Sequence, residues 1–200
     1  MATTKVDVNL LGATGTPGSG TFLRGDGTWN APDGGWEEVS STTASASATV
    51  DFTGLADGYD YKVEIIKSLP ATDNTPLRMR FGTGGTPTYL TSAYLSRYGF
   101  IFTDTTAGAS TDTVGFRISS HQGNATGEWL NGVVDIFDPG SAAIHLIRAM
   151  TDAKDNAANN ELVYTTSIQT GTTAVTALRF MYESGNIASG LFKLLRIGRS

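Results

Sequence analysis

The fold class is decided by residues 48–66, which read ATVDFTGLADGYDYKVEII. Apolar and polar residues alternate from Ala48 to Thr53 and again from Tyr59 to Ile66. Alternation with a period of two places one face of a strand in a core and the other face in solvent. Residues 56–58 between the two runs are typical of a turn, so we expect two strands joined as a hairpin.

The same alternation continues toward the C-terminus in short apolar runs separated by Gly, Asn, Asp or Pro. These runs are residues 77–81, 94–102, 114–118, 132–137, 144–150, 162–168, 174–181 and 190–197. Together they give about ten strands, spaced as in an antiparallel sandwich or barrel. Residues 152–161 are too polar to bury a helix face, and we expect a loop there. The sequence therefore predicts an all-β protein, an antiparallel β-sandwich of the jelly-roll type.

Composition narrows the function classes. The chain of 200 residues suits one domain plus an arm, and its 40% hydrophobic content is that of a folded protein. A formal net charge of -5 lacks the basic footprint that nucleic-acid binding needs. The absence of cysteine excludes disulfides and thiolate metal sites. The sequence contains no apolar stretch of about 18 residues that could insert into a membrane, and its N-terminus has no apolar region typical of a signal peptide. We therefore expect synthesis in the cytoplasm.

Residues 1–35 are predicted to form an extended N-terminal arm, and residues 36–200 the β-sandwich head. The arm is dense in Gly, Pro, Thr and Asp from residue 12 onward and shows neither helical nor strand periodicity. It nevertheless carries Phe22, Leu23 and Trp29, large apolar residues that are not typical of a solvated linker. We expect these side chains to be buried against another protein or a second copy of the chain. Folding of Trp29 onto its own head is the alternative.

Residues 15–29 resemble a sequence that recurs in bacteriophage tail fibres and tail-associated proteins, just before a C-terminal binding domain. The core of the likeness is LRGDGTW at residues 23–29. The later chain resembles, more loosely, small phage jelly-roll domains in its Tyr59-x-Tyr61 strand and in its turns at residues 70–73 and 184–190. The resemblance implies a bacteriophage virion structural protein, a short tail-fibre or receptor-binding module exposed on the particle surface.

The glycine and aromatic residues of the arm motif would suit a threefold assembly. Glycines let backbones approach closely, and one aromatic from each chain can fill a shared axial core. Arg24 and Asp26 could then pair between subunits. We therefore expect a homotrimer that contacts other virion proteins of the tail or capsid. The assembly and virion-docking residues are expected to be Phe22, Leu23, Arg24, Asp26 and Trp29.

Two other functions stay open. The first is a capsid decoration protein that grips the shell as a trimer, and the second is a polysaccharide-degrading spike. No Gly-x-Ser-x-Gly motif and no metal-ligand spacing around His121 or His145 is present, so we expect no enzyme activity and no cofactor. Asp152, Asp155 and Asn156 could supply calcium ligands, but turn chemistry explains them equally well.

A receptor such as a host surface glycan or protein would be bound through exposed aromatics or loops. The aromatic and cationic candidates for sugar stacking are Tyr89, Tyr94, Arg97, Tyr98 and Trp129. The candidate loops are residues 83–89, 103–112 and 121–127. Strand aromatics can equally fill the core. His145 is expected to be an exposed strand position.

Overall fold

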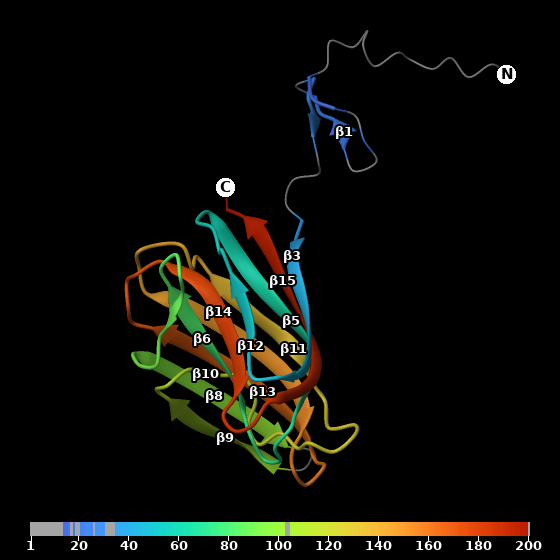
Figure 1. Cartoon of the computed structure of the whole chain (residues 1–200), viewed down its shortest axis with the longest axis vertical. Helices are drawn as coiled ribbons and strands as arrows, with labels where there is room; N and C mark the ends of the chain where they lie inside the picture. Colours follow the sequence, from blue (N-terminus) through green and yellow to red (C-terminus); the bar gives the residue numbers. More distant parts are fainter. Residues whose placement is uncertain are drawn as a thin grey trace, which may run out of the picture. The chain divides into compact units, whose positions relative to one another are not determined.

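The structure, a computed structural model, describes residues 14–16, 18, 21–25, 27–30, 35–102 and 105–199. The chain forms two compact units, residues 1–35 and residues 36–200, coloured by sequence in Figure 1. The described residues contain no helix, and hence no helix that could span a membrane. We call the second unit the head.

The first unit contains a small hairpin. Strand β1 (Phe22–Leu23) pairs antiparallel with β2 (Trp29–Asn30), and the amide of Gly27 donates to the carbonyl of Arg24 across the turn at 3.0 Å. Gly27 has a φ of 81°, in the left-handed region that favours glycine. The sequence shows no strand periodicity here because strands of two residues are too short to show alternation.

The head is an antiparallel β-sandwich, as the sequence predicts. Its large sheet has the strand order β3-β15-β5-β11-β12-β13-β8-β9, and its small sheet the order β10-β6-β14-β4, with β7 paired to β6. The large sheet comprises β3 (Glu37–Ser47), β5 (Tyr59–Pro70), β8 (Tyr94–Phe102), β9 (Thr105–Asp112), β11 (Leu130–Phe137), β12 (His145–Lys154), β13 (Asn160–Gln169) and β15 (Ile187–Gly198). The small sheet comprises β4 (Val50–Thr53), β6 (Leu77–Thr83), β7 (Thr88–Tyr89), β10 (Phe116–Arg117) and β14 (Val175–Tyr182).

Two local predictions were wrong. Residues 48–66 do not form a hairpin, because β4 pairs with β14 in the small sheet whereas β5 lies between β15 and β11 in the large sheet. The chain crosses between the sheets at this and several later connections, in the manner of a jelly roll. Residues 152–161 are mostly strand, since β12 and β13 extend into them and leave only residues 155–159 as a turn.

Aromatic side chains fill the space between the sheets. Phe180 of β14 lies 5.4 Å from Phe192 of β15, measured between ring centroids, and so joins the small sheet to the large one. Phe116 of β10 contacts Tyr94 of β8 in the same way at 4.8 Å. All four residues are buried, and each such side chain contributes a large apolar area and a specific ring geometry to the core.

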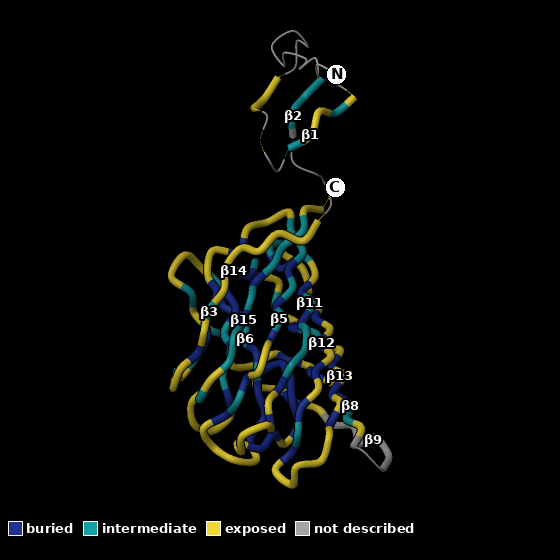
Figure 2. Tube along the Cα trace, turned by 90° about the vertical axis from the view of Figure 1, so that its right-hand side faces the viewer, coloured by how far each residue is buried: buried dark blue, intermediate teal, exposed yellow. Residues whose placement is uncertain are grey.

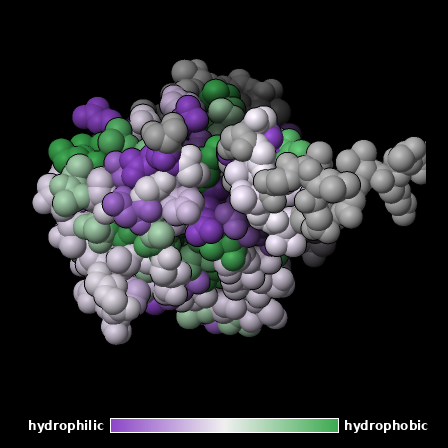
Figure 3. Space-filling model, turned by 90° about the horizontal axis from the view of Figure 1, so that it is seen from above, coloured by the Kyte–Doolittle hydropathy of each residue, from purple (hydrophilic) through white to green (hydrophobic). Residues whose placement is uncertain are grey.

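The two ends of the head differ in character. Strands β3 and β15 pair so that Glu37 and Arg196 lie at one end, which we call the proximal end, and Ser47 and Ile187 lie at the other, the distal end. The chain enters the head at the proximal end. Arg199 forms ion pairs there with Asp57, Asp60 and Asp138. Figure 3 views this end, where hydrophilic residues lie among hydrophobic ones.

Replacing Phe180 by alanine should destabilise the head by about 3–5 kcal/mol, because a large cavity would open between the sheets. Urea unfolding followed by circular dichroism measures the loss. The exposed Thr53→Ala variant on the same sheet should stay within about 0.5 kcal/mol of the natural chain. A loss below about 1 kcal/mol at Phe180 would contradict the assigned core.

Candidate functional site

Four exposed turns converge at the distal end of the head, and we call them the distal loops: residues 71–74, 124–127, 156–159 and 183–186. Figure 2 shows them as exposed turns at the end of the head away from the C-terminus. They are joined by hydrogen bonds. The amide of Ala71 donates to the carbonyl of Asn186 at 2.8 Å, and the Asn124 side-chain amide donates to the carbonyl of Ala71 at 3.2 Å. The amide of Asn156 donates to the carbonyl of His121 at 3.0 Å.

A buried polar network lies beneath these loops. Gln122 is fully buried, and its Nε2 donates to the carbonyls of Ser68 at 2.8 Å and Glu128 at 3.2 Å. The Tyr182 hydroxyl donates to Gln122 Oε1 at 2.8 Å and also lies 2.9 Å from the Ser68 hydroxyl. Burial raises the pKa of Tyr182, which keeps its hydroxyl protonated as a donor. Satisfied buried networks of this kind fix a local geometry, so the loops have a rigid base.

The turn at residues 155–159 is organised by Asp155. Its carboxylate accepts hydrogen bonds from the amides of Ala157 at 2.9 Å and Asn159 at 2.8 Å, and from the Asn159 side chain at 3.0 Å. Burial alone would raise the pKa of Asp155, but these hydrogen bonds outweigh it and hold the pKa below its ordinary value. Of the candidate calcium ligands, Asp155 is thus used within the turn and Asp152 lies in strand β12. The described residues contain no cluster of three or more metal-ligating side chains.

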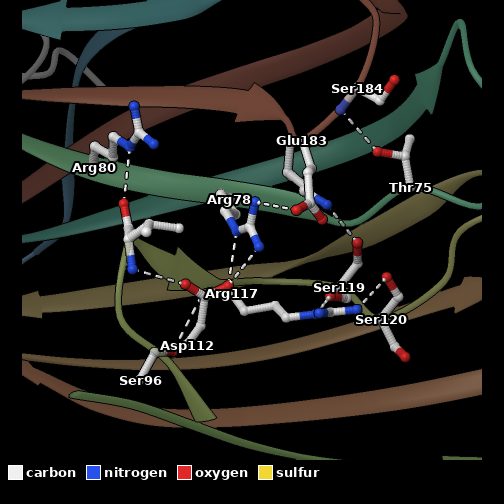
Figure 4. Close-up of polar contacts among 12 residues, drawn as sticks. Thr75, Arg78, Arg80, Ser96, Asp112, Arg117, Ser119, Ser120, Glu183 and Ser184 are labelled. Atoms are coloured by element: carbon white, nitrogen blue, oxygen red, sulfur yellow. Dashed lines mark hydrogen bonds and ion pairs between the residues drawn. The ribbon is translucent and has the colours of Figure 1, made fainter. Parts of the chain in front are cut away.

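An arginine side chain fixes the turn at residues 183–186 to the sheets, as Figure 4 shows. Arg78 of β6 pairs with Asp112 at 2.7 Å and with Glu183 at 3.0 Å. Next to this contact, the amide of Ser184 donates to the Thr75 hydroxyl at 3.1 Å. These contacts set where the turn at residues 183–186 leaves the small sheet.

The segment before the distal loop at residues 124–127 is also held by an arginine. Arg117 donates to the carbonyls of Ser119 and Ser120, both at 3.1 Å, and its guanidinium lies 4.7 Å from the centre of the Tyr98 ring. The loop that carries Asn124 therefore leaves the sandwich from a fixed position.

One serine–histidine contact could be mistaken for catalytic machinery. The Ser120 hydroxyl lies 2.8 Å from His121 Nδ1. Ser120 is fully buried, so its hydroxyl has no open face on which a substrate could react. The arrangement at the distal end suits binding by exposed polar groups on a fixed frame.

A buried acid lies close to this contact. Glu161 of β13 is 2% exposed, and neither of its carboxylate oxygens has a hydrogen-bond partner among the described residues. Burial raises the pKa of Glu161, and the charge of Asp155 raises it further, whereas Ser120 and Arg117 oppose the shift. An ionised carboxylate in this position is unfavourable because burial has removed its water, and the opposing effects of Ser120 and Arg117 do not offset that loss.

The five predicted receptor residues do not form one site. Tyr94 is 1% exposed and Tyr98 lies buried beside Arg117, so neither can offer a ring to a sugar, and those two predictions were wrong. The Tyr94 ring packs against Phe116 in the core, and the Tyr98 ring packs against Arg117. Arg97 lies on the outer face of the large sheet, away from the distal loops.

The last two candidates lie at opposite ends of the head. Tyr89 is near the proximal end, where the guanidinium of Arg179 lies 3.7 Å from its ring centre. Trp129 is 37% exposed and adjoins the distal loops, with Lys67 Nζ 4.6 Å from its ring. Trp129 is therefore the one predicted aromatic that could contribute to a distal binding surface.

The predicted loops also separate. Residues 105–112 form strand β9, and residues 103–104 lie outside the described residues. Residues 83–89 turn at the proximal end. Only residues 121–127 contribute to the distal loops, and even there Gln122 is buried. The other distal loops also contain turn-forming residues such as Asn, Asp, Ser and Gly. The sequence around each loop does not indicate that the loops converge.

The predicted docking residues of the arm are partly exposed. Phe22 is 46% exposed and Leu23 is exposed beside it, whereas Trp29 is half-buried. The guanidinium of Arg24 lies 6.0 Å from the centre of the Phe22 ring. Asp26 lies outside the described residues, so its predicted pairing with Arg24 stays a prediction.

Gly15 is required for this local structure. Its φ is 93°, and a Cβ there would approach the carbonyl oxygen of Trp29 to 2.7 Å. The amide of Trp29 in turn donates to the carbonyl of Thr14 at 2.8 Å. The residues before the hairpin are thus tied to its second strand.

Comparison with known proteins finds no match: no family model, no curated protein and no solved structure is similar to this chain.

Replacing Glu161 by glutamine should stabilise the head near pH 8 by about 1–3 kcal/mol, because a neutral amide costs less to bury than an ionised carboxylate. The folded chain holds the Glu161 proton more tightly than the unfolded chain, whose pKa is near 4.5. The natural chain therefore loses stability as pH rises from 4.5 through the raised pKa, and the variant lacks this loss. Urea unfolding of both chains between pH 4 and 8 measures the difference. An equal difference at every pH would show that Glu161 is not the titrating group.

Proposed function

We propose that this chain is a bacteriophage virion structural protein, a short tail-fibre or receptor-binding module. Its arm docks on the virion, and its head presents the distal loops to the host surface. One observation carries the proposal: Leu23 and Trp29 of the LRGDGTW sequence pair in a small hairpin with exposed apolar side chains, and this sequence precedes a β-sandwich whose chain entry and loop cluster lie at opposite ends. That is the arrangement an attached binding module requires.

The arm supports docking. Phe22 and Leu23 are apolar and exposed on a hairpin of only two short strands. A two-stranded hairpin is marginally stable alone, so a partner surface that covers these side chains would stabilise both. Assembly of the arm as a homotrimer would supply such a surface, with contacts to other virion proteins.

The head supports recognition without catalysis. The distal loops expose small polar groups on a rigid base, and Trp129 lies beside them. Loops on a rigid sandwich accept sequence changes without loss of the fold, as a receptor-binding surface must. A host glycan or surface protein is the proposed receptor. Location on the capsid as a decoration protein is the competing assignment, and the second experiment below separates the two.

Replacing Phe22 by serine should reduce attachment of the protein to the virion about 10- to 100-fold. Burial of a phenylalanine side chain contributes about 1.5–3 kcal/mol, and 1.4 kcal/mol is a factor of ten. Quantitative mass spectrometry of purified particles measures attachment. Val39→Ser is the matched control, because Val39 is equally exposed but lies on edge strand β3 of the head. Equal loss in the two variants would contradict docking through the arm.

Replacing residues 72–74 and 124–127 by glycine–serine segments of equal length should abolish adsorption of particles to host cells. The distal loops are exposed, so the head should melt at nearly the natural temperature. The control exchange is residues 84–86, an exposed turn at the proximal end. Normal adsorption by complete particles would contradict the receptor function. Lowered capsid stability in the Phe22→Ser particles would then support the decoration protein.

A further inference from the structure

The outer face of the large sheet carries apolar side chains in rows. Strand register places side chains of β11, β12, β13 and β8 side by side across this face. One row comprises Phe137, Leu146, Ile168 and Leu95, and another comprises Val133, Met150, Tyr164 and Gly99. A polar row of Asp135, Arg148, Thr166 and Arg97 lies between them. A fourth row comprises Asn131, Asp152, Leu162 and Ile101. We call the four rows together the outer face.

The apolar side chains of this face are exposed to solvent. Met150 is 58% exposed, Leu95 is 53% exposed and Leu146 is 50% exposed. Isolated exposed apolar residues are ordinary, but contiguous rows across four strands are not. Patches of this kind mark interaction sites.

The polarity of β13 is reversed relative to a strand of a monomeric sandwich. Its inward residues include Glu161, Thr165 and Ser167, all buried. Its outward residues include Leu162, Tyr164 and Ile168. A strand with one solvated face places its apolar residues inward. The outer side of β13 therefore has the composition of a buried surface.

The shape of the face also suits close packing. A hollow of about 370 Å³ is lined by side chains that include Val133, Met150 and Tyr164. Tyr164 lies over Gly99, where a Cβ would come within 2.1 Å of the tyrosine ring, so β8 has no side chain in that row. A second hollow of about 320 Å³ shares Thr166 with the first. Exposed side chains such as Met150 thus lie beside hollows that could accept an exposed side chain from a partner surface.

We infer that the outer face packs against the head of a second copy of this chain. Charge favours a second copy, because the chain has a net charge of -5 whereas the outer face carries Arg97 and Arg148 with Asp135 and, at its margin, Asp152. A face that holds both signs in equal number can pair with itself without bringing net like charge into the contact.

The size of the face agrees with this partner. Four strands about 4.8 Å apart, each contributing about seven residues at about 3.4 Å, span roughly 450 Å² before side-chain relief is counted. A standard interface buries about 800 Å² on each partner, measured on the corrugated surface. The outer face therefore supplies the larger part of one standard interface. This inference rests on the self-assembly in the proposed function and adds to the arm contact a second contact, between the heads of two copies.

Sedimentation of the full chain at micromolar concentration tests the inference. Met150→Arg places a charge on the outer face and should weaken the association of heads at least tenfold, which lowers the assembled mass to that of copies held by the arm alone. Thr53→Arg, an exposed position on the outer side of the small sheet, should leave assembly unchanged. Assembly unchanged by Met150→Arg would overturn the inference and leave assembly through the arm intact. A natural chain that is monomeric at every concentration would overturn the self-assembly as well.

A cysteine readout identifies the occupant of the face, because the chain has no cysteine of its own. Met150→Cys should react with a maleimide at least tenfold more slowly than Thr53→Cys when the chain is assembled, and at an equal rate after dilution to monomer. Equal rates in the assembled chain would overturn the inference. If adding Phe22→Ser removes the protection while the assembled mass persists, the arm of another copy covers the face, and head-to-head packing is overturned.

Discussion

Aromatic packing between two sheets of unequal width is the constraint on which the rest of the head depends. Phe180 on Phe192, and Phe116 on Tyr94, hold the small sheet against the large one. The small sheet has five strands and the large sheet eight, so one apolar layer cannot cover the whole inner face. The remainder must be covered by the connecting segments and must satisfy their backbone groups.

That requirement explains the polar interior beneath β8, β12 and β13. The Thr151 hydroxyl donates to the carbonyl of Ile118 at 2.6 Å, and the Thr165 hydroxyl donates to the carbonyl of Arg117 at 2.7 Å. Both carbonyls belong to the end of the short strand β10 and the residue that follows it. Several inward positions of these strands, such as Thr151, Thr165 and Ser167, are therefore given to polar residues, and the same strands also place apolar residues outward, on the outer face.

Alternation in the sequence located most strands but could not say which face is the core, because a period of two fits either side. His145 shows this limit: it was predicted to be exposed, yet it is fully buried with Nε2 2.9 Å from the carbonyl oxygen of Thr173, and its neighbour Leu146 is exposed instead. Apolar content alone would have reversed the two. Strand β9 was predicted as a loop because its Thr, Gly, Ala and Ser residues carry no apolar pattern. Pairing with β8, a tertiary property, makes it a strand.

The distal loops were predictable as turns and not as a site. Asn and Asp at residues 73–74 and 155–156 indicate turns locally. Their convergence depends on Gln122, a polar residue that contacts Ser68 and Tyr182 from distant parts of the chain. A glutamine in a Gly- and Asn-rich segment carries no sequence signal for that role. Because the distal loops lie at one end of the strands and the outer face along their length, a head can use one surface for recognition and the other for assembly without competition between them.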